Sequence, residues 1–318
     1  MTQIKKVGVL GAGVMGHGIA AHLAGAGIPC LLLDIVPPKF SDEDAKAGLT
    51  EQDPRFRNKF AIAGIEAIKK SKPSVIYTQR DLKLITPGNF EDDFEKLKEC
   101  DWIIEVVVER LDIKQSVFSK IEKVMGDHTI ISSNTSGIPL KAMAEGRSEK
   151  FRKNFVLTHF FNPVRYLKLV ELVSSNETDP QVVKTTVAFL EDVLGKGVVY
   201  AKDTTNFIAN RIGTYAFMTG MKSIIDGKYT IEEADKILGP ALGKPKSAMF
   251  KTADLVGIDT LAHVVKNSYD NCLQDESRNT FVMPDVVNKI IANKWLGDKT
   301  GQGFYKKTKG ADGKKEIL

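Results

Sequence analysis

Residues 5–34, KKVGVLGAGVMGHGIAAHLAGAGIPCLLLD, decide the predicted fold. Residues 5–10 have the composition of a buried strand, and a glycine-rich turn follows them. A helical stretch then runs to about Gly25, and a second apolar strand ends at Asp34. The order of strand, G-x-G-x-x-G turn, helix, strand and acid is typical of a dinucleotide-binding unit. The sequence therefore predicts a nucleotide site at this turn.

Each glycine of the turn has its own expected role. Gly11 permits the tight turn, Gly13 lets the backbone approach a pyrophosphate, and Gly16 lets the helix pack closely on the strand. The free N–H groups and partial positive charge of the helix N-terminus favour phosphate. Asp34 would bind the adenosine ribose and repel a 2′-phosphate, and no arginine follows it, so we expect NAD rather than NADP. The alternative is a glycine-rich turn that binds no ligand.

The alternation of strands and helices resumes after residue 100. WIIEVVV (102–108) and TIISS (129–133) are apolar runs typical of central parallel strands, with an amphipathic helix predicted between them at 114–125. This pattern predicts an α/β fold with a Rossmann-type, doubly wound parallel sheet. Such sheets bind ligands at the carboxyl ends of their strands, where the sequence places Gly11, Glu109 and Ser136.

Residues 37–100 are polar and charged, and we expect them to form a long insertion between the second and third core strands. Within it, residues 56–71 predict a helix, and we expect three breakers to interrupt regular structure: Pro73, Pro87 and Gly88. Lysines gather at the end of that helix: Lys69, Lys70 and Lys72. They form either a solvated cluster or a contact to a phosphate-bearing substrate tail.

Two short apolar strands, FVLTH (155–159) and LKLVELV (167–173), flank a turn. As antiparallel partners around a turn centred near Arg165, they would place His159 opposite Glu171, with Cβ atoms about 5 Å apart. Glu171 interrupts an apolar strand, and a buried carboxylate without a partner is costly, so we expect the two side chains to touch. The pair serves either catalysis or structure alone.

The pattern changes to helices only after residue 199. We therefore predict a NAD-binding domain at residues 1–202, with an antiparallel extension of its sheet, and a smaller all-α domain at 203–318. The helices are expected at four places: 207–225, 231–238, 251–267 and 285–292. The polar end of the chain, residues 303–318, is expected to be either a disordered terminus or the stub of a linker.

Composition excludes several classes of protein. With 42% hydrophobic and 27% charged residues, the 318-residue chain is globular. No apolar run approaches the ~18 residues that span a bilayer, and a net charge of +5 is too small to indicate nucleic-acid binding. Three widely spaced cysteines make a metal cluster or a disulfide framework unexpected. We expect a cytoplasmic protein without a bound metal.

The chain resembles the L-3-hydroxyacyl-CoA dehydrogenases of fatty-acid β-oxidation. The resemblance rests on GAGVMGHGIA with Asp34, IEVVVERLDIK, SSNTSG, HFFNPVRYLKLVE, KDTTNFIANR, GIDT and KTGQGFY. The insertion and HFFNPVRYLKLVE are most similar to the dehydrogenase part of long bacterial proteins that also carry an enoyl-CoA hydratase domain. The resemblance implies NAD as cofactor, an acyl-CoA thioester as substrate, and a homodimer. It also implies that the helical domain at 203–318 serves substrate binding and dimerisation and that, in a longer chain, a hydratase domain is linked.

The resemblance also implies a role for each matching residue. His159 would be the general base that takes the proton of the substrate 3-hydroxyl, and Glu171 would orient it. Ser136 and Asn210 would hydrogen-bond the reacting oxygen. The cofactor, beside the glycine turn and Asp34, would be contacted by Glu109, Lys114, Asn162 and Lys299. A histidine suits the task because it titrates near neutral pH.

Two stretches depart from the family pattern. Thr205 and Asn206 stand where the family has proline and glycine, which affects the hinge before the helical domain. Residues 247–249, Ser-Ala-Met, replace a glycine-proline stretch, which affects dimer packing or the acyl pocket. Two other functions remain open: an NAD-dependent dehydrogenase of a free hydroxy acid, and a non-catalytic NAD-binding protein.

Overall fold

The computed structural model describes residues 3–309 and 315–317. The chain folds into two compact units, Met1–Thr204 and Thr205–Leu318, and each is described by itself. No helix in the described part of the chain is both long and apolar enough to cross a lipid bilayer.

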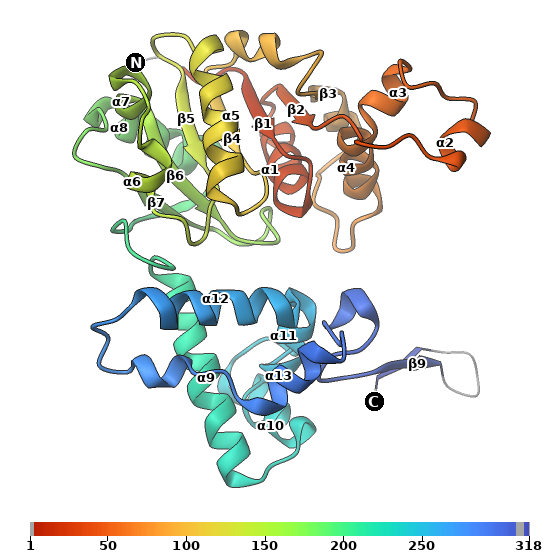
Figure 1. Ribbon diagram of the computed structural model, residues 1–318, viewed down its shortest axis with the longest axis vertical. Helices are drawn as coiled ribbons and strands as arrows, with labels where there is room; N and C mark the ends of the chain where they lie inside the picture. The colour runs from red at the N-terminus through yellow and green to blue at the C-terminus, as the bar shows by residue number, and fades with distance from the viewer. Residues whose placement is uncertain (1–2, 310–314, 318) are drawn as a thin grey trace. The chain divides into compact units, whose positions relative to one another are not determined.

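The first unit is built on one eight-stranded sheet with the order β3-β2-β1-β4-β5-β6-β7-β8 (Figure 1). The strands are β1 (Val7–Leu10), β2 (Cys30–Asp34), β3 (Ile85–Asn89), β4 (Trp102–Glu105), β5 (Ile130–Ser133), β6 (Phe155–Phe160), β7 (Leu169–Val173) and β8 (Gly197–Tyr200). From β3 to β6 every pairing is parallel, whereas β6 and β7 are antiparallel. This order confirms the predicted Rossmann-type sheet and its antiparallel extension.

The longest helix of the first unit buries one face that is mostly apolar. In α5 (Leu111–Val124) the spacing of buried residues follows the helical period, namely Lys114, Val117, Phe118, Ile121 and Val124. The other helices are α1 (Val14–Gly25), α2 (Asp42–Lys46), α3 (Pro54–Arg57), α4 (Lys59–Lys70), α6 (Leu140–Ala144), α7 (Glu149–Lys153) and α8 (Pro180–Ala188), which continues as a short π-helix. Asp53 and Asp179 cap α3 and α8, each followed by proline at the first helical position.

The insertion contributes a strand to the sheet, which corrects one prediction. Pro87 and Gly88 are expected from the sequence to interrupt regular structure, but both lie inside β3, which pairs with β2. Strand β3 is an edge strand, where a proline can leave its missing N–H on the unpaired side. Gly88 is needed because a Cβ there would come within 2.6 Å of Leu33 and 2.5 Å of Asp93.

The second unit is helical: α9 (Ala209–Gly227), α10 (Ile231–Ile237), α11 (Phe250–Val256), α12 (Ile258–Asn271) and α13 (Asp285–Ala292) (Figure 1). The expected helix at 251–267 is in fact two helices, because Gly257 has a φ of +101° and separates α11 from α12. Near the C-terminus β9 (Lys307–Lys309) pairs with β10 (Lys315–Ile317). Residues 310–314 and 318 of the expected polar tail lie outside the described residues.

Asn206 explains how this chain forms the turn before α9 without the family glycine. Its φ is +62°, a left-handed conformation that asparagine tolerates better than most residues. Its buried side chain donates hydrogen bonds to the carbonyl of Val264 (2.9 Å) and to the hydroxyl of Ser268 (2.7 Å), both on α12. The asparagine therefore replaces the conformational freedom of glycine and ties the turn to α12.

Candidate active site

The glycine turn leaves open space above the start of α1. Gly11 has a φ of +108°, and a Cβ there would lie 2.5 Å from the carbonyl of Val106. A Cβ on Gly16 would lie 1.7 Å from the carbonyl of Gly11, so helix and strand can pack this closely only with glycine. A Cβ on Gly13 would meet nothing within 4 Å, so the space beside it is free for a ligand. This arrangement fits a pyrophosphate at the helix N-terminus.

Asp34 closes one side of the same pocket. Its carboxylate accepts hydrogen bonds from the backbone N–H groups of Ala12 (2.6 Å) and Ile35 (2.7 Å), which fix its orientation beside the turn. The cavity next to it measures about 500 Å³ and is mostly apolar, which suits an adenine ring with its ribose. Both features fit NAD.

The insertion supplies a wall of this cavity that was not predicted from the sequence. Phe60, Ala63, Gly64 and Ala67 of α4 line it together with His17 of α1. Burial lowers the pKa of His17 below its ordinary value. A Cβ on Gly64 would approach the carbonyl of Ala12 to 3.0 Å, so a small residue lets α4 lie close to the glycine turn. In the sequence, the small residues at 63, 64 and 67, which recur within one helical turn, were the signal for this close packing of α4.

A buried ion pair follows the third core strand. Glu105, the last residue of β4, is fully buried and binds the ammonium of Lys114 on α5 through both carboxylate oxygens (2.8 and 3.0 Å). It also accepts hydrogen bonds from the hydroxyl of Ser133 (2.5 Å) and the N–H of Val107 (2.6 Å). Burial raises the pKa of Glu105, whereas the ammonium opposes that rise. Glu105 was not among the predicted site residues, although a charged residue in an apolar strand was visible there as it was for Glu171.

Glu109 connects this ion pair to the predicted substrate side of the site. The Lys114 ammonium lies 3.2 Å from one of its oxygens. Its other oxygen accepts hydrogen bonds from the Thr135 hydroxyl and from the N–H groups of Ser136 (3.1 Å) and Gly137 (3.2 Å). The carboxylate therefore holds the turn that presents Ser136. Lys114 itself is buried behind Glu109, and its predicted contact to the cofactor stays a prediction.

His159 and Glu171 meet as the hairpin register predicted. They are directly paired residues of β6 and β7, and Nδ1 of His159 lies 2.7 Å from Oε2 of Glu171. Both residues are buried, with 6% and 1% of their surface exposed. The Phe161 ring packs on the imidazole with 4.4 Å between centroids. A carboxylate on Nδ1 fixes the tautomer and the orientation of an imidazole, and it stabilises the imidazolium form.

The remaining predicted residues lie in three places. Asn162 is exposed in the turn after β6. Asn210 is in the first turn of α9, and Lys299 is in a short 3₁₀ turn, where its ammonium binds both oxygens of Asp259 at 2.6 Å. Asn210 and Lys299 belong to the second unit, and their contacts to substrate and cofactor stay predictions.

Asn210 lines an apolar cavity of about 260 Å³ within the second unit. Helices α9, α11 and α12 form it, with Phe217, Met249 and Leu261 among its residues. Met249 belongs to the stretch that departs from the family pattern, and it packs close to Gly220 of α9. The stretch that differs from the family pattern, residues 247–249, therefore contributes to the wall of this cavity through Met249.

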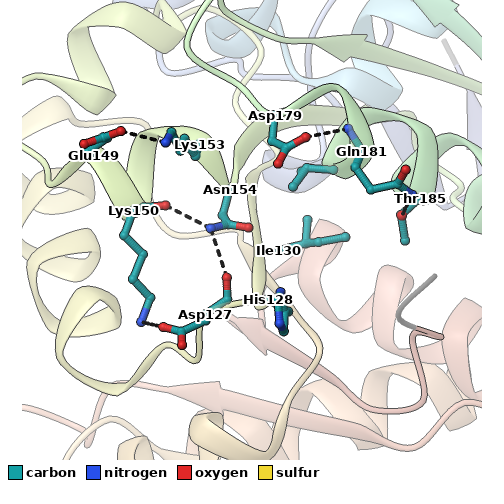
Figure 2. A pocket seen from close by; sticks show the side chains of 11 residues that line it. Asp127, His128, Ile130, Glu149, Lys150, Lys153, Asn154, Asp179, Gln181 and Thr185 are labelled. Atoms are coloured by element: carbon teal, nitrogen blue, oxygen red, sulfur yellow. Dashed lines mark hydrogen bonds and ion pairs between the residues drawn. The ribbon is translucent and has the colours of Figure 1, made fainter.

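A pocket of about 560 Å³, larger than the cavity beside Asp34, lies at the opposite end of the strands (Figure 2). It is near the amino end of β5, and charged side chains surround it. These charges already have partners: Lys150 binds Asp127 at 2.9 Å, Lys153 binds Glu149 at 2.6 Å, and Asp179 caps α8. Because ligands of doubly wound sheets bind at the carboxyl ends of the strands, we place the site at the glycine turn and not here.

Comparison with known proteins identifies the family of each part of the chain. Residues 6–204 match the family model described as the NAD binding domain of 3-hydroxyacyl-CoA dehydrogenase, and residues 207–307 match its C-terminal domain. The chain is 52% identical over 96% of its length to a probable 3-hydroxyacyl-CoA dehydrogenase of Bacillus subtilis, of which it covers 38%. It is 47% identical to a protein of the same name from Deinococcus radiodurans, with 96% of this chain and 84% of the relative covered.

A further relative is named a putative fatty acid oxidation complex trifunctional enzyme, from Rickettsia felis; it is 37% identical over 96% of this chain and 40% of its own length. Thus the chain spans only about two fifths of some curated relatives.

Solved structures with the same fold include FadB2 of M. tuberculosis (29% identity, TM-score 0.76, 96% and 99% of the two chains covered). Another is the (S)-3-hydroxybutyryl-CoA dehydrogenase PaaH1 of Ralstonia eutropha (28% identity, TM-score 0.72, 95% and 98% covered). Both family models match in sequence order, and together they span most of the chain. The chain therefore belongs to the 3-hydroxyacyl-CoA dehydrogenase family of NAD-dependent dehydrogenases, with the family's NAD-binding domain followed by its C-terminal domain.

Proposed function

We propose that this chain oxidises L-3-hydroxyacyl-CoA thioesters to 3-ketoacyl-CoA thioesters, with His159 as the general base. The observation that carries the proposal is the buried 2.7 Å contact between His159 and Glu171. Oxidation of a secondary alcohol needs an acceptor for the hydride and a base for the hydroxyl proton, and bound NAD supplies the first. A histidine held by a carboxylate supplies the second.

In the proposed reaction, Nε2 of His159 takes the proton of the 3-hydroxyl. Glu171 fixes the imidazole and stabilises its positive charge after the proton has moved. Ser136, held in place by Glu109, and Asn210 would donate hydrogen bonds to the reacting oxygen, and in the reverse direction these bonds would stabilise a developing alkoxide. Asn162 and Lys299 would contact the cofactor.

The apolar cavity beside Asn210 supports an acyl chain as the part of the substrate that extends from the reacting carbon. The name of the relative from Rickettsia felis supports linkage to a hydratase domain in a longer chain. The proposal also includes a homodimer formed through the helical domain. It further includes a domain division near residue 202 and a cytoplasmic location. The free, buried Cys30 and Cys100 are consistent with a reducing compartment.

The test measures NADH oxidation at 340 nm with acetoacetyl-CoA and with longer 3-ketoacyl-CoA thioesters. Free 3-keto acids of matched length provide the comparison. We expect turnover with the thioesters and little with the free acids. Turnover only with free acids would favour the hydroxy-acid dehydrogenase alternative, and NADH binding without turnover of either class would favour a non-catalytic protein.

A further inference from the structure

Lys196 is a buried lysine whose role the proposed chemistry does not explain. Only 6% of its surface is exposed, and it forms no salt bridge with a carboxylate of the described residues. Its ammonium donates hydrogen bonds to the carbonyls of Val164 and of Leu167 (3.0 Å). Both carbonyls belong to the turn between β6 and β7. A lysine just before β8 therefore binds the backbone of the turn that follows His159.

Burial of this ammonium is unfavourable by itself. Removing a cation from water costs several kcal/mol unless strong interactions offset it, and burial lowers the pKa of Lys196 to about 8. The ionisable groups nearby are also basic and offer no negative charge: His22 on α1, whose Nε2 contacts the Leu194 carbonyl (3.0 Å), and Arg165 in the turn. An apolar residue could fill the same space without this cost. The two hydrogen bonds to the turn are therefore what the lysine contributes.

The turn that Lys196 binds has several other supports, among them a hydrogen bond from the Tyr166 hydroxyl to the Ser74 carbonyl (2.8 Å). Val164 packs against α1, where a Cβ on Gly18 would lie 3.2 Å from it. Arg165 donates hydrogen bonds to the carbonyls of Ser74 (2.8 Å) and Ile76 (2.7 Å). These contacts fix the turn from the side of α1 and from the side of the insertion. Lys196 binds the same turn from the side of β8, through the carbonyls of Val164 and Leu167.

We propose that Lys196 is a positioning residue, which fixes the β6–β7 turn so that Phe161 and Asn162 keep their places beside His159. The ring of Phe161 already packs on the imidazole, and Asn162 is the expected cofactor contact in the same turn. A turn released from Lys196 would let both residues move while the His159–Glu171 pair, held by strand pairing, remains. This inference rests on the proposed function for its catalytic readout, whereas NADH affinity tests it independently.

The experiment compares Lys196→Met with Lys196→Arg and with Val182→Ala. Methionine removes both donors at similar length, arginine restores donors and charge, and Val182 is a core residue of α8 that serves as the control for lost stability. For each variant we would measure the thermal midpoint, the NADH dissociation constant, and kcat and KM for acetoacetyl-CoA at a single low temperature, below every midpoint.

For Lys196→Met we expect kcat/KM to fall roughly tenfold, mainly through kcat, because misplaced groups lose orientation rather than substrate binding. NADH should bind several-fold more weakly, and Lys196→Arg should recover most of both losses. Val182→Ala should lower only the thermal midpoint. If Lys196→Met behaves like Val182→Ala at the low temperature, the proposal is wrong.

If the methionine variant does not fold, Lys196→Gln, which retains an amide donor, takes its place with the same expected direction. If the wild-type chain turns over no thioester, the proposed function fails, and the NADH affinities of the same variants still decide the role of Lys196.

Discussion

His22 should make the first unit sensitive to mild acid. It lies on α1 with 8% of its surface exposed, its Nε2 contacts the Leu194 carbonyl, and its Nδ1 has no hydrogen-bond partner among the described residues. Burial, and secondarily the charge of Lys196, lowers the pKa of His22 from 6.5 to about 4. The folded unit therefore keeps this histidine neutral at pH values where an unfolded chain protonates it.

The sign and size of the effect follow from that difference in pKa. Between pH 6.5 and 4 the unfolded chain binds more protons than the folded one, so the free energy of unfolding falls as the pH falls. With values of 6.5 and about 4, the loss between pH 7 and pH 5 amounts to about 2 kcal/mol. His22→Gln, which keeps an amide donor for the Leu194 carbonyl but does not titrate, should lack this part of the pH dependence.

The chain offers a clean optical probe of the first unit. It has two tryptophans: Trp102, which is fully buried in β4, and Trp295 in the second unit. In a Trp295→Phe background, urea unfolding followed by fluorescence would report on Trp102 alone. Between pH 7 and pH 5, the free energy of unfolding of the protein with His22 should fall by about 2 kcal/mol more than that of the His22→Gln variant. His128→Gln, at an exposed histidine, is the matched control. Equal losses in wild type and His22→Gln would refute the reasoning.

Three further changes test the site directly. His159→Gln should lower kcat by roughly 10²-fold or more, because the general base is lost, while fluorescence titration finds NADH affinity unchanged; an unchanged kcat would remove His159 from the mechanism. Glu171→Gln should lower kcat by about tenfold or more without unfolding the sheet, because the amide cannot stabilise the imidazolium; steady-state kinetics with thermal melts separate these effects. Asp34→Ala should weaken NADH binding by about tenfold, the value of a hydrogen bond to a charged group, and should reduce discrimination against NADPH; equal affinities in wild type and variant would mean that the carboxylate does not face the ribose.

The parts of the site that could be predicted depend on short, regular patterns. The glycine turn is defined by six consecutive residues, and each glycine has a steric reason that the structure confirms at Gly11 and Gly16. The His159–Glu171 contact follows from the two-residue period of strands, because a hairpin of fixed register pairs residues at equal distances from its turn. In both cases local sequence determines the geometry.

The parts that were missed depend on contacts distant in sequence. Strand β3 has a proline and a glycine at its centre, and only pairing with β2 makes that segment extended. One wall of the cavity beside Asp34 comes from α4, which lies far along the chain from the glycine turn. The small residues of α4 permit close packing, but by themselves they do not indicate what the helix packs against. Gly257, which divides the expected helix at 251–267, was visible in the sequence, but its positive φ was not.

Buried ionisable pairs distinguish the end of the sheet that carries the candidate site from the opposite end of the sheet. At the end of the sheet where the parallel strands have their carboxyl ends, Glu105 pairs with Lys114 and Glu171 pairs with His159. Both pairs bury charged or polar groups, which is costly. At the amino end of β5 the charged residues remain partly or fully exposed, so their ion pairs contribute little. A protein that needed only a stable sheet could have apolar residues at the four buried positions. The cost is explained if these groups orient one another for chemistry, and the variants of His159 and Glu171 test that explanation at the pair where the proton would move.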